Sequence, residues 1–385
     1  MTQPTPFYNK TNPFFASIKE RYSLCQPGST KIVQHIVLDV SGSDIHYDVG
    51  DSIGIFPQND PIIVEKTLQA MQASGEEVVH DKQGEGEWLL RDFLTTKGNI
   101  TEISRKLLLE FSLRQTNPEK KEFFNQLHAE ENKEDLKKYL NSHHLWDLLL
   151  AHQEVKFTPQ ELCLFLMPLL PRLYSISSSK HWIKDEIHLT IAAVEYETNE
   201  QKRRGVCTHH LCALAPLNKP VLPIYIQPHH GFTLPENHEV PIIMVGPGTG
   251  IAPFRAFMQA RLAHGASGDS WLFFGEWHRK QHFFYEEFWQ DLVNQGKLRL
   301  DVAFSRDQEH KVYVQHRMLE QGAELFDWIE KGAHLYVCGD AQQMAKDVEA
   351  ALYQIIQTYG NHSEADTKLY LKRLRAEKRY LRDVY

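Results

Sequence analysis

The sequence has 385 residues, with 42 lysines and arginines against 50 aspartates and glutamates, which gives a formal net charge of −8. At roughly 100–200 residues per domain, this length predicts two or three domains, each of which buries its own core. A net acidic chain argues against a dedicated nucleic-acid-binding protein. The longest apolar run, residues 162–170, is too short to cross a bilayer, so we expect no membrane segment.

The N-terminal residues lack the basic and apolar regions of a secretion signal, so we expect a cytoplasmic protein. An odd number of widely spaced cysteines does not form a disulfide framework in a chain of this length, and reduced thiols are expected. The cysteines are Cys25, Cys163, Cys207, Cys212 and Cys338. Cys207 and Cys212 flank two histidines, but no second pair accompanies them. Zinc is therefore the less favoured interpretation there, and we assign no metal site.

The first part of the chain changes its pattern twice. Apolar residues alternate between Gly-Asp turns from Lys31 to Pro57, which predicts antiparallel strands. Helical spacing follows from Pro61 to about Leu150. Its charge-rich stretch Pro118 to Leu140 is either a solvated helical face or a partner-binding surface. Alternation returns from Leu173 to Ile226. These patterns predict a discontinuous β domain, residues 17–60 and 161–235, with a helical insert at 61–160.

From Pro241 onward, short apolar strands alternate with helices. The predicted strands are Ile242–Val245, Trp271–Phe274, Leu298–Phe304 and His334–Val337. The predicted helices are Pro253–Ala263, Phe283–Val293, Arg317–Lys331 and Gln343–Tyr359. Such alternation is typical of a doubly wound parallel sheet, here assigned to residues 236–385. Nucleotides bind at the carboxyl ends of the strands in sheets of this kind.

A glycine-rich loop, residues 246–255, joins the first of these strands to a helix. Gly248 and Thr249 stand where backbone N–H groups and a helix N-terminus can meet a pyrophosphate. Glycines also serve close packing of a strand on a helix, so the loop alone is weak evidence. Its spacing, G-x-G-x-G-x-x-P, differs from the G-x-G-x-x-G of ordinary dehydrogenases.

Five ordered motifs resemble the FAD- and NADPH-binding half of diflavin reductases, above all the flavoprotein component of NADPH-dependent sulfite reductase. Besides the glycine loop they are Arg172-Leu-Tyr-Ser175, Gly205-Val-Cys-Thr208, Ser305-Arg-Asp-Gln308 with residues 311–315, and Tyr336-Val-Cys-Gly-Asp340. The ending, residues 378–385, is similar too. The resemblance implies an antiparallel β-barrel that carries FAD, an α-helical insert between its strands, and an α/β parallel-sheet domain that carries NADPH.

The resemblance implies an FAD site made by two motifs and one strand. Arg172 suits a diphosphate, Tyr174 can stack on the flavin, and the Ser175 hydroxyl can reach its reactive nitrogen. The other residues implied are Thr190, Ile191, Ala192, Tyr196, Gly205, Val206, Cys207 and Thr208. Taken alone, the first motif can equally be a strand with one exposed arginine and one packed tyrosine.

Donors and positive charge after the third parallel strand suit the 2′-phosphate of NADPH. They are Ser305, Arg306, Lys311, Tyr313 and Gln315, and we also assign Asp340 and Met344 to the coenzyme. Glu276 departs from the related sequences, which more often have a neutral residue there. We expect it to be an exposed loop residue, although an acid at a strand end can also hold the ribose of NAD.

For hydride transfer the resemblance implicates Ser175, Cys338 and Asp383, with Tyr385 stacked on the flavin. These groups would orient the nicotinamide and the flavin, while the flavin carries the chemistry. Two alternatives stand beside this assignment. Cys338 can be a small core residue, and Asp383 and Tyr385 can belong to a frayed chain end.

Only about 16 residues precede the similarity, whereas a flavodoxin-like domain needs ~150 residues, so we expect no FMN site in this chain. The function predicted is an NADPH-dependent, FAD-containing reductase that passes single electrons to a sulfite reductase haemoprotein or a flavodoxin-like FMN protein. A stand-alone NADPH–flavodoxin or ferredoxin reductase and a non-catalytic FAD-binding subunit are the alternatives. The basic segment 372–382 either docks an acidic carrier or forms a solvated final helix.

Overall fold

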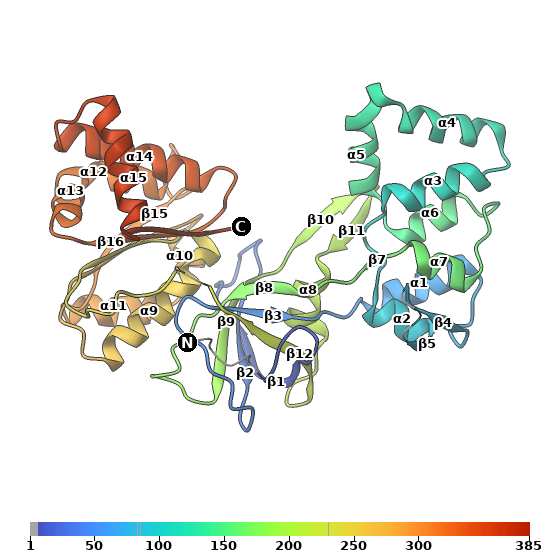
Figure 1. Cartoon of the computed structure of the whole chain (residues 1–385), viewed down its shortest axis with the longest axis horizontal. Coiled ribbons are helices and arrows are strands. Elements are labelled where there is room, and N and C mark those ends of the chain that lie inside the picture. The colour runs from blue at the N-terminus through green and yellow to red at the C-terminus, as the bar shows by residue number, and fades with distance from the viewer. Residues whose placement is uncertain (1–6, 83, 85, 230) are drawn as a thin grey trace. The chain divides into compact units, whose positions relative to one another are not determined.

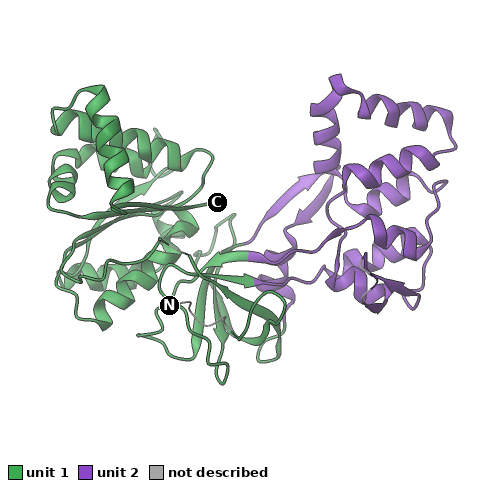
Figure 2. Ribbon diagram, in the orientation of Figure 1, with its two compact units in different colours: residues 1–54, 173–192, 216–385 green, residues 55–172, 193–215 purple. Residues whose placement is uncertain are grey.

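The computed structural model describes residues 7–82, 84, 86–229 and 231–385. Most of the N-terminal stretch used to judge a secretion signal lies outside the described residues. The chain divides into two compact units (Figure 2). Unit 1 comprises residues 1–54, 173–192 and 216–385, and unit 2 comprises residues 55–172 and 193–215. Unit 2 thus contains the expected helical insert together with flanking segments, and the two predicted nucleotide-binding regions fall largely in unit 1.

The N-terminal region forms a six-stranded sheet in the order β8-β3-β12-β1-β2-β9. Its strands are β1 (Phe14–Ser23), β2 (Val33–Asp39), β3 (Ser52–Ile55), β8 (Arg172–Ser175), β9 (Glu186–Ala192) and β12 (Pro220–Gln227). The ladders of β1 with β12, β1 with β2, and β2 with β9 are antiparallel, as predicted. The end strands β8 and β9 share no ladder in the described sheet, and Ile176, which follows β8, forms only an isolated bridge with Leu189, so the barrel is not closed.

The C-terminal region holds a five-stranded sheet in the order β15-β14-β13-β16-β17, in which every ladder is parallel. The strands are β13 (Ile242–Val245), β14 (Ser270–Glu276), β15 (Arg299–Phe304), β16 (His334–Gly339) and β17 (Tyr380–Val384). Helices lie on both sides of this sheet (Figure 1). They are η3 (Gly248–Ile251), α9 (Ala252–Ala263), α10 (Arg279–His282), α11 (Glu286–Asn294), α12 (Val314–Glu320), α13 (Gly322–Glu330), α14 (Met344–Tyr359) and α15 (Glu364–Ala376).

Because helices cover both faces of the parallel sheet, its central strands are continuous apolar runs. All residues of β13 and β14 are buried, and alternate side chains enter different cores. Ile243 and Val245 pack with the α12–α15 layer, whereas Ile242 and Met244 pack with the α9 and α11 layer. This is the pattern of a parallel sheet that is buried on both sides, so the doubly wound prediction is confirmed.

Three details of this region differ from the prediction. The helix expected over 317–331 is two helices that meet at Gln321, and a short helix, α10, precedes α11. Strand β17 was not predicted, because polar residues such as Arg382 and Asp383 interrupt its apolar pattern. An edge strand needs only one hydrogen-bonded neighbour and can carry such residues.

Unit 2 is mainly helical. Its helices are α1 (Pro61–Met71), α2 (Leu90–Thr96), α3 (Arg105–Arg114), α4 (Pro118–His128), η1 (Glu130–Asn132), α5 (Lys133–Ser142), α6 (Leu145–Ala151), α7 (Pro159–Phe165), α8 (Val206–His209) and the π-turn η2 (His210–Leu214). Caps such as Asp60, Ser104 and Asn117 begin helices there by accepting backbone N–H groups. Two-stranded pieces interrupt the helices: β4 (Val78–His80) with β5 (Glu87–Leu89), β6 (Gly98–Asn99) with β7 (Met167–Pro168), and β10 (Glu195–Thr198) with β11 (Gln201–Arg204).

Three features of the described residues bear on membrane insertion, metal binding and disulfide formation. No helix there is both long and apolar enough to span a membrane. In the same residues, no group of three or more histidines, cysteines and acids is arranged to hold a metal ion. The five cysteines are all free thiols.

Candidate active site

The glycine-rich loop lies directly on the end of β16. A Cβ atom at Gly250 would stand 2.1 Å from the carbonyl oxygen of Cys338, so no larger residue fits without displacing the backbone. Gly248 has a φ of +60°, a left-handed conformation that glycine adopts at little cost. The close approach brings the loop to the carboxyl ends of β13 and β16, the edge at which parallel sheets bind nucleotides.

A cavity of about 570 Å³ opens beside this loop. Its lining includes residues that the sequence assigned to the coenzyme: Gly248, Ser305, Arg306, Lys311, Tyr313, Gln315, Asp340 and Met344. Arg306 and Lys311 form no ion pair with any residue that the structure describes. Two unpaired cations beside hydroxyl and amide donors match a phosphate group, so the donor set fits the 2′-phosphate end of NADPH.

Asp340 also has a structural task that the sequence did not indicate. Its Oδ2 accepts the backbone N–H groups of Gln343 at 2.7 Å and Met344 at 3.0 Å, at the start of α14. These bonds hold the pKa of the Asp340 carboxyl below its usual range. Asp340 therefore anchors the helix that carries Met344 to the cavity wall.

Three residues that the sequence assigned to hydride transfer meet at the ends of β8, β16 and β17. The Ser175 hydroxyl donates to Asp383 Oδ2 at 2.9 Å, and the Cys338 thiol lies 3.9 Å from the same oxygen. Cys338 and Asp383 are register partners in the parallel ladder. Burial, and then the negative charge of Asp383, raise the pKa of the Cys338 thiol well above its usual range. The thiol therefore stays protonated and acts as a donor.

His229, which was not predicted from the sequence, faces the same carboxylate. The Phe232 N–H donates to His229 Nδ1 at 3.2 Å, which leaves the hydrogen of a neutral ring on Nε2. That Nε2 atom lies 3.9 Å from Asp383 Oδ1. Asp51 holds the backbone of His229 in place by accepting its N–H at 2.9 Å. No local motif marks His229, because its partner lies more than 150 residues away in sequence.

Tyr385 is fixed to the sheet. Its backbone N–H donates to the Gly339 carbonyl at 3.1 Å, and its carbonyl accepts the Ala341 N–H at the same distance. The phenol oxygen lies 3.1 Å from Thr249 Oγ1 in the glycine loop, and 63% of the residue is exposed. The structure therefore does not show the frayed end that was the alternative. Cys338 is fully buried, as the core alternative required, and it also contacts the site.

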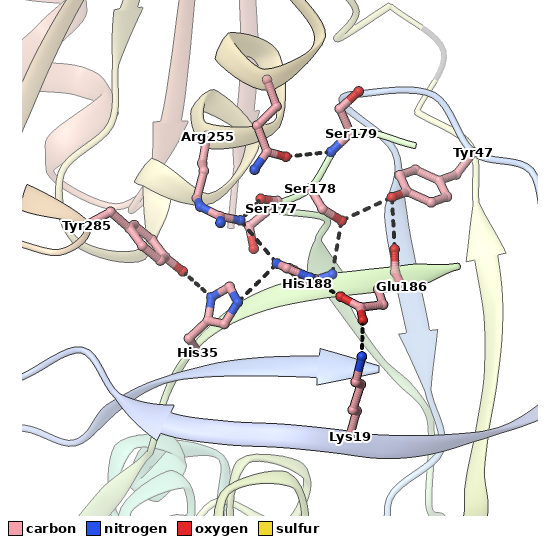
Figure 3. A network of polar contacts seen from close by, with 11 residues as sticks. Lys19, His35, Tyr47, Ser177, Ser178, Ser179, Glu186, His188, Arg255 and Tyr285 are labelled. Atoms are coloured by element: carbon pink, nitrogen blue, oxygen red, sulfur yellow. Dashed lines mark hydrogen bonds and ion pairs between the residues drawn. The ribbon is translucent and has the colours of Figure 1, made fainter. Parts of the chain in front are cut away.

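A buried polar network includes two histidines of the antiparallel sheet, Arg255 and Tyr285 (Figure 3). Arg255 of α9 donates to the Ser177 carbonyl oxygen at 2.8 Å and approaches His188 Nδ1 to 3.3 Å. His188 Nδ1 is 3.1 Å from His35 Nε2, and His35 Nδ1 is 2.8 Å from the hydroxyl of Tyr285. Burial, and then the nearby Arg255, lower the pKa of His35 to about 2, so this ring stays neutral. The network joins β2 and β9 to the helices that follow the glycine loop.

The residues assigned to FAD are divided between the two units. In unit 1, Ile191 is buried on β9, an end strand of the sheet, and the Thr190 hydroxyl bonds the Tyr285 hydroxyl at 2.7 Å. The Thr190 side chain is thus committed to the network, which leaves only its backbone for a flavin. Ala192 ends β9, and Tyr174 precedes Ser175 on β8.

In unit 2, Gly205 caps α8, whose first residues are Val206 and the buried Cys207. The Thr208 hydroxyl donates to the Gly205 carbonyl and accepts the Val194 N–H, both at 3.1 Å. This hydroxyl therefore shapes the turn, and it was expected only to meet a pyrophosphate. Two further FAD candidates, Tyr196 and Arg172, are exposed. The Tyr196 hydroxyl is 3.4 Å from His144 Nε2, and the Arg172 guanidinium is 3.6 Å from the Glu102 carboxylate.

One sequence expectation about charge needs correction. Glu276 is not an exposed loop residue, because it ends β14 with only 3% of its side chain exposed and pairs with Lys31 at 2.5 Å. The basic C-terminal segment spans the end of α15, the last helix, where Lys372, Arg373 and Arg375 are exposed, and most of β17. Several of its cations already have acidic partners: Arg375 and Arg382 both pair with Glu349, and Arg373 and Arg379 pair with Glu377.

An antiparallel sheet followed by a parallel sheet with a glycine-rich loop at its strand ends is the layout of two-domain flavin and pyridine-nucleotide oxidoreductases. The family described as "FAD binding domain" matches residues 6–210, more than half of the chain. The family described as "Oxidoreductase NAD-binding domain" matches residues 244–350. The chain belongs to the FAD-binding-domain family of oxidoreductases, and it carries the NAD-binding domain as well.

Among curated proteins, the chain is 44% identical over 380 residues to the sulfite reductase (NADPH) flavoprotein alpha-component of Bacillus subtilis, strain 168. It is 39% identical over 382 residues to the protein of the same name from Shewanella sp., strain ANA-3. Each match covers 98% of this chain and 62% of the relative. The chain thus spans less than two thirds of the length of these relatives.

Proposed function

We propose that this chain takes a hydride from NADPH onto bound FAD and passes electrons singly to a protein acceptor, as the reductase part of a sulfite reductase system. The observation that carries the proposal is the cavity lined by the unpaired Arg306 and Lys311, at the same strand ends as the Ser175–Cys338–Asp383 cluster. The relatives are named as NADPH flavoproteins of sulfite reductase, which supports this coenzyme and this system.

The six-stranded sheet would act as the FAD-binding barrel, residues 17–60 and 161–235, with the insert 61–160 between its strands and the NADPH domain after it. When bound, FAD accepts two electrons as a hydride and releases them one at a time. The residues that would hold it are Arg172, Tyr174, Ser175, Thr190, Ile191, Ala192, Tyr196, Gly205, Val206, Cys207 and Thr208. Backbone donors of a turn and the edge of a strand suit an extended dinucleotide, which supports this assignment.

Asp383 would organise the groups around the reacting atoms. Its carboxylate accepts from both Ser175 and Cys338, which fixes the direction of the hydroxyl and keeps the thiol hydrogen directed at Oδ2. His229, with 35% of its side chain exposed, would direct its Nε2–H toward Asp383 Oδ1 from 3.9 Å and so add a third polar group around the carboxylate. The Tyr385 ring would cover the flavin until nicotinamide displaces it. These residues orient and stabilise charge and form no covalent bond to substrate.

The acceptor would be a sulfite reductase haemoprotein, directly or through a flavodoxin-like FMN protein. The cytoplasmic location expected from the sequence stays a prediction. A stand-alone NADPH–flavodoxin or ferredoxin reductase is the alternative enzyme, and an FAD-containing subunit without catalysis is the alternative of another class.

Ferricyanide reduction by the purified protein tests the enzyme proposal, because it needs no native acceptor. We expect NADPH to drive the reaction far better than NADH. Bound FAD without ferricyanide reduction would indicate the non-catalytic subunit. Sulfite reduction upon mixing with a sulfite reductase haemoprotein, with and without a flavodoxin-like protein, then distinguishes the acceptors; transfer to flavodoxin or ferredoxin alone would favour the stand-alone reductase.

A further inference from the structure

The wall of the coenzyme cavity includes Glu276, whose ion pair with Lys31 the proposed function does not use. Lys31, which precedes β2, places its Nζ 2.5 Å from Glu276 Oε1 at the end of β14. The side chain of Glu276 is 3% exposed and that of Lys31 is 27% exposed. The two residues are 245 positions apart in sequence, so only the fold of unit 1 brings them together.

Glu276 stands where a pyridine-nucleotide site can discriminate between its two coenzymes. It ends the second strand of the parallel sheet, lines the cavity, and lies 3.7 Å from where a Cβ of Gly248 would be. In doubly wound dinucleotide sites an acid at this point accepts the ribose hydroxyls of NAD. An available carboxylate would therefore favour NADH and repel the 2′-phosphate of NADPH.

Both oxygens of this carboxylate are already engaged. Oε1 accepts from Lys31, and Oε2 accepts the backbone N–H of Trp277 at 2.7 Å. Trp277 in turn packs with two cations: Lys31 Nζ lies 4.4 Å from its ring centroid and the Arg306 guanidinium 3.5 Å. Lys31 thus neutralises the acid and contacts the ring that supports a predicted phosphate ligand.

The loop that carries Lys31 is held firmly against this part of the cavity wall. Gln26 donates its N–H to the Gln281 carbonyl at 3.0 Å, and the Ser29 hydroxyl lies 2.9 Å from His282 Nε2. The same hydroxyl accepts the Lys31 N–H at 2.9 Å. These hydrogen bonds fix the backbone at Lys31, which restricts where its ammonium group can lie.

We propose that Lys31 is a coenzyme-specificity residue. By neutralising the Glu276 carboxylate, which would otherwise favour NAD, it allows this part of the cavity wall to accept the 2′-phosphate of NADPH. The proposal rests on the proposed function, since it explains how the site tolerates Glu276 and still takes NADPH. Without Lys31, a buried carboxylate would face a group of charge about −1.5 to −2, and like charges at such range cost binding energy. The same carboxylate would then be available to a ribose hydroxyl.

Calorimetric binding of 2′,5′-ADP and 5′-ADP to the FAD-loaded protein tests this without turnover. We expect the wild type to prefer 2′,5′-ADP and Lys31→Met to reduce that preference by about tenfold, with tighter binding of 5′-ADP. Lys31→Arg keeps the charge and should keep the preference. Lys280→Met, which removes a cation from exposed α10, is the matched control for net charge.

A double variant separates electrostatics from packing. Glu276→Gln alone should retain the preference for 2′,5′-ADP, and Lys31→Met with Glu276→Gln should restore it. The proposal is overturned if Lys31→Met weakens the binding of both ligands by the same factor. It is also overturned if the double variant fails to regain the preference for 2′,5′-ADP. A wild type that does not distinguish the two ligands would instead contradict the NADPH assignment itself. If Lys31→Met folds poorly, the same binding measurements on Lys31→Arg and Glu276→Gln still test the proposal. A loss of the preference for 2′,5′-ADP in either variant contradicts it.

Discussion

Asp383 is the residue on which the candidate active site depends. A hydroxyl and a thiol donate toward its carboxylate, and a histidine faces it from a third direction. Because its charge fixes the direction of these donors, Asp383→Asn should slow reduction of the flavin by NADPH by about tenfold to a hundredfold. FAD content should stay unchanged.

Stopped-flow measurement of flavin bleaching under nitrogen checks the Asp383 prediction. Asp327→Asn, an exposed aspartate paired with Lys331, is the control. A rate equal to that of the wild type would remove Asp383 from hydride transfer. A loss of FAD would assign it to flavin binding instead.

Substitution of Arg306 tests how much one side chain contributes to coenzyme recognition. Its guanidinium stacks on Trp277 and forms no ion pair among the described residues, so it is available to a phosphate. Arg306→Ala should weaken NADPH binding by about 1.5–3 kcal/mol, the value of a hydrogen bond to a charged group, and NADH binding much less. Dissociation constants for both coenzymes provide the measurement. Equal losses would point to a general packing role.

Tyr385 is expected to act as a selectivity gate. If its ring covers the flavin, displacing it costs about 0.5–1.5 kcal/mol of aromatic stacking. NADPH offsets this cost through its 2′-phosphate contacts, and NADH cannot. Tyr385→Ala should therefore lower the NADH Michaelis constant and raise NADH-driven ferricyanide reduction, while NADPH turnover stays flat or falls. Steady-state kinetics with both coenzymes measure this; an unchanged ratio of kcat/KM would exclude the gate.

At the scale of elements, β2 and β9 are held to the helices α9 and α11 by a network of neutral histidines. Burial lowers the pKa of His35 to about 2 and also lowers the pKa of His188. An unfolded histidine titrates near 6.5, so below that pH the unfolded chain binds more protons than the folded one. Stability should therefore be complete above pH 6.5 and decrease as the pH falls toward 2.

His35→Gln tests this linkage. The wild type should lose roughly 1–2 kcal/mol through His35 between pH 7 and pH 5, and the variant should lose less over the same range because this group is absent. Denaturant unfolding at both pH values gives the comparison, with His80→Gln at an exposed position as the control. The same pH dependence in all three proteins would contradict the account.

Strands with a helix layer on each face could be predicted from the sequence. Contacts between segments far apart in the chain could not. Strands β13, β14 and β16 are mainly apolar because each face meets a helix layer, and this pattern is local. Strand β17 lies at an edge and carries polar residues, so its pattern is weak. The environment of Glu276 was predicted wrongly because its partner, Lys31, is 245 residues away. His229 was missed for the same reason.

At the scale of the whole molecule, the parallel sheet gathers most of the residues assigned to NADPH in one cavity, and Ser175 joins Cys338 and Asp383 at the same sheet edge. The residues assigned to FAD belong to both units. The match to 62% of the relatives' length leaves the electron acceptor as the main question about the system.

Anaerobic titration of the purified chain with NADPH is the most direct test of the central claim. Acid release should first yield one FAD per chain and no FMN, because only one flavin site was recognised. One equivalent of NADPH should then bleach that flavin fully, and NADH should do so far more slowly. Stoichiometric FMN, a flavin that NADPH leaves oxidised, or equal rates with the two coenzymes would contradict the account.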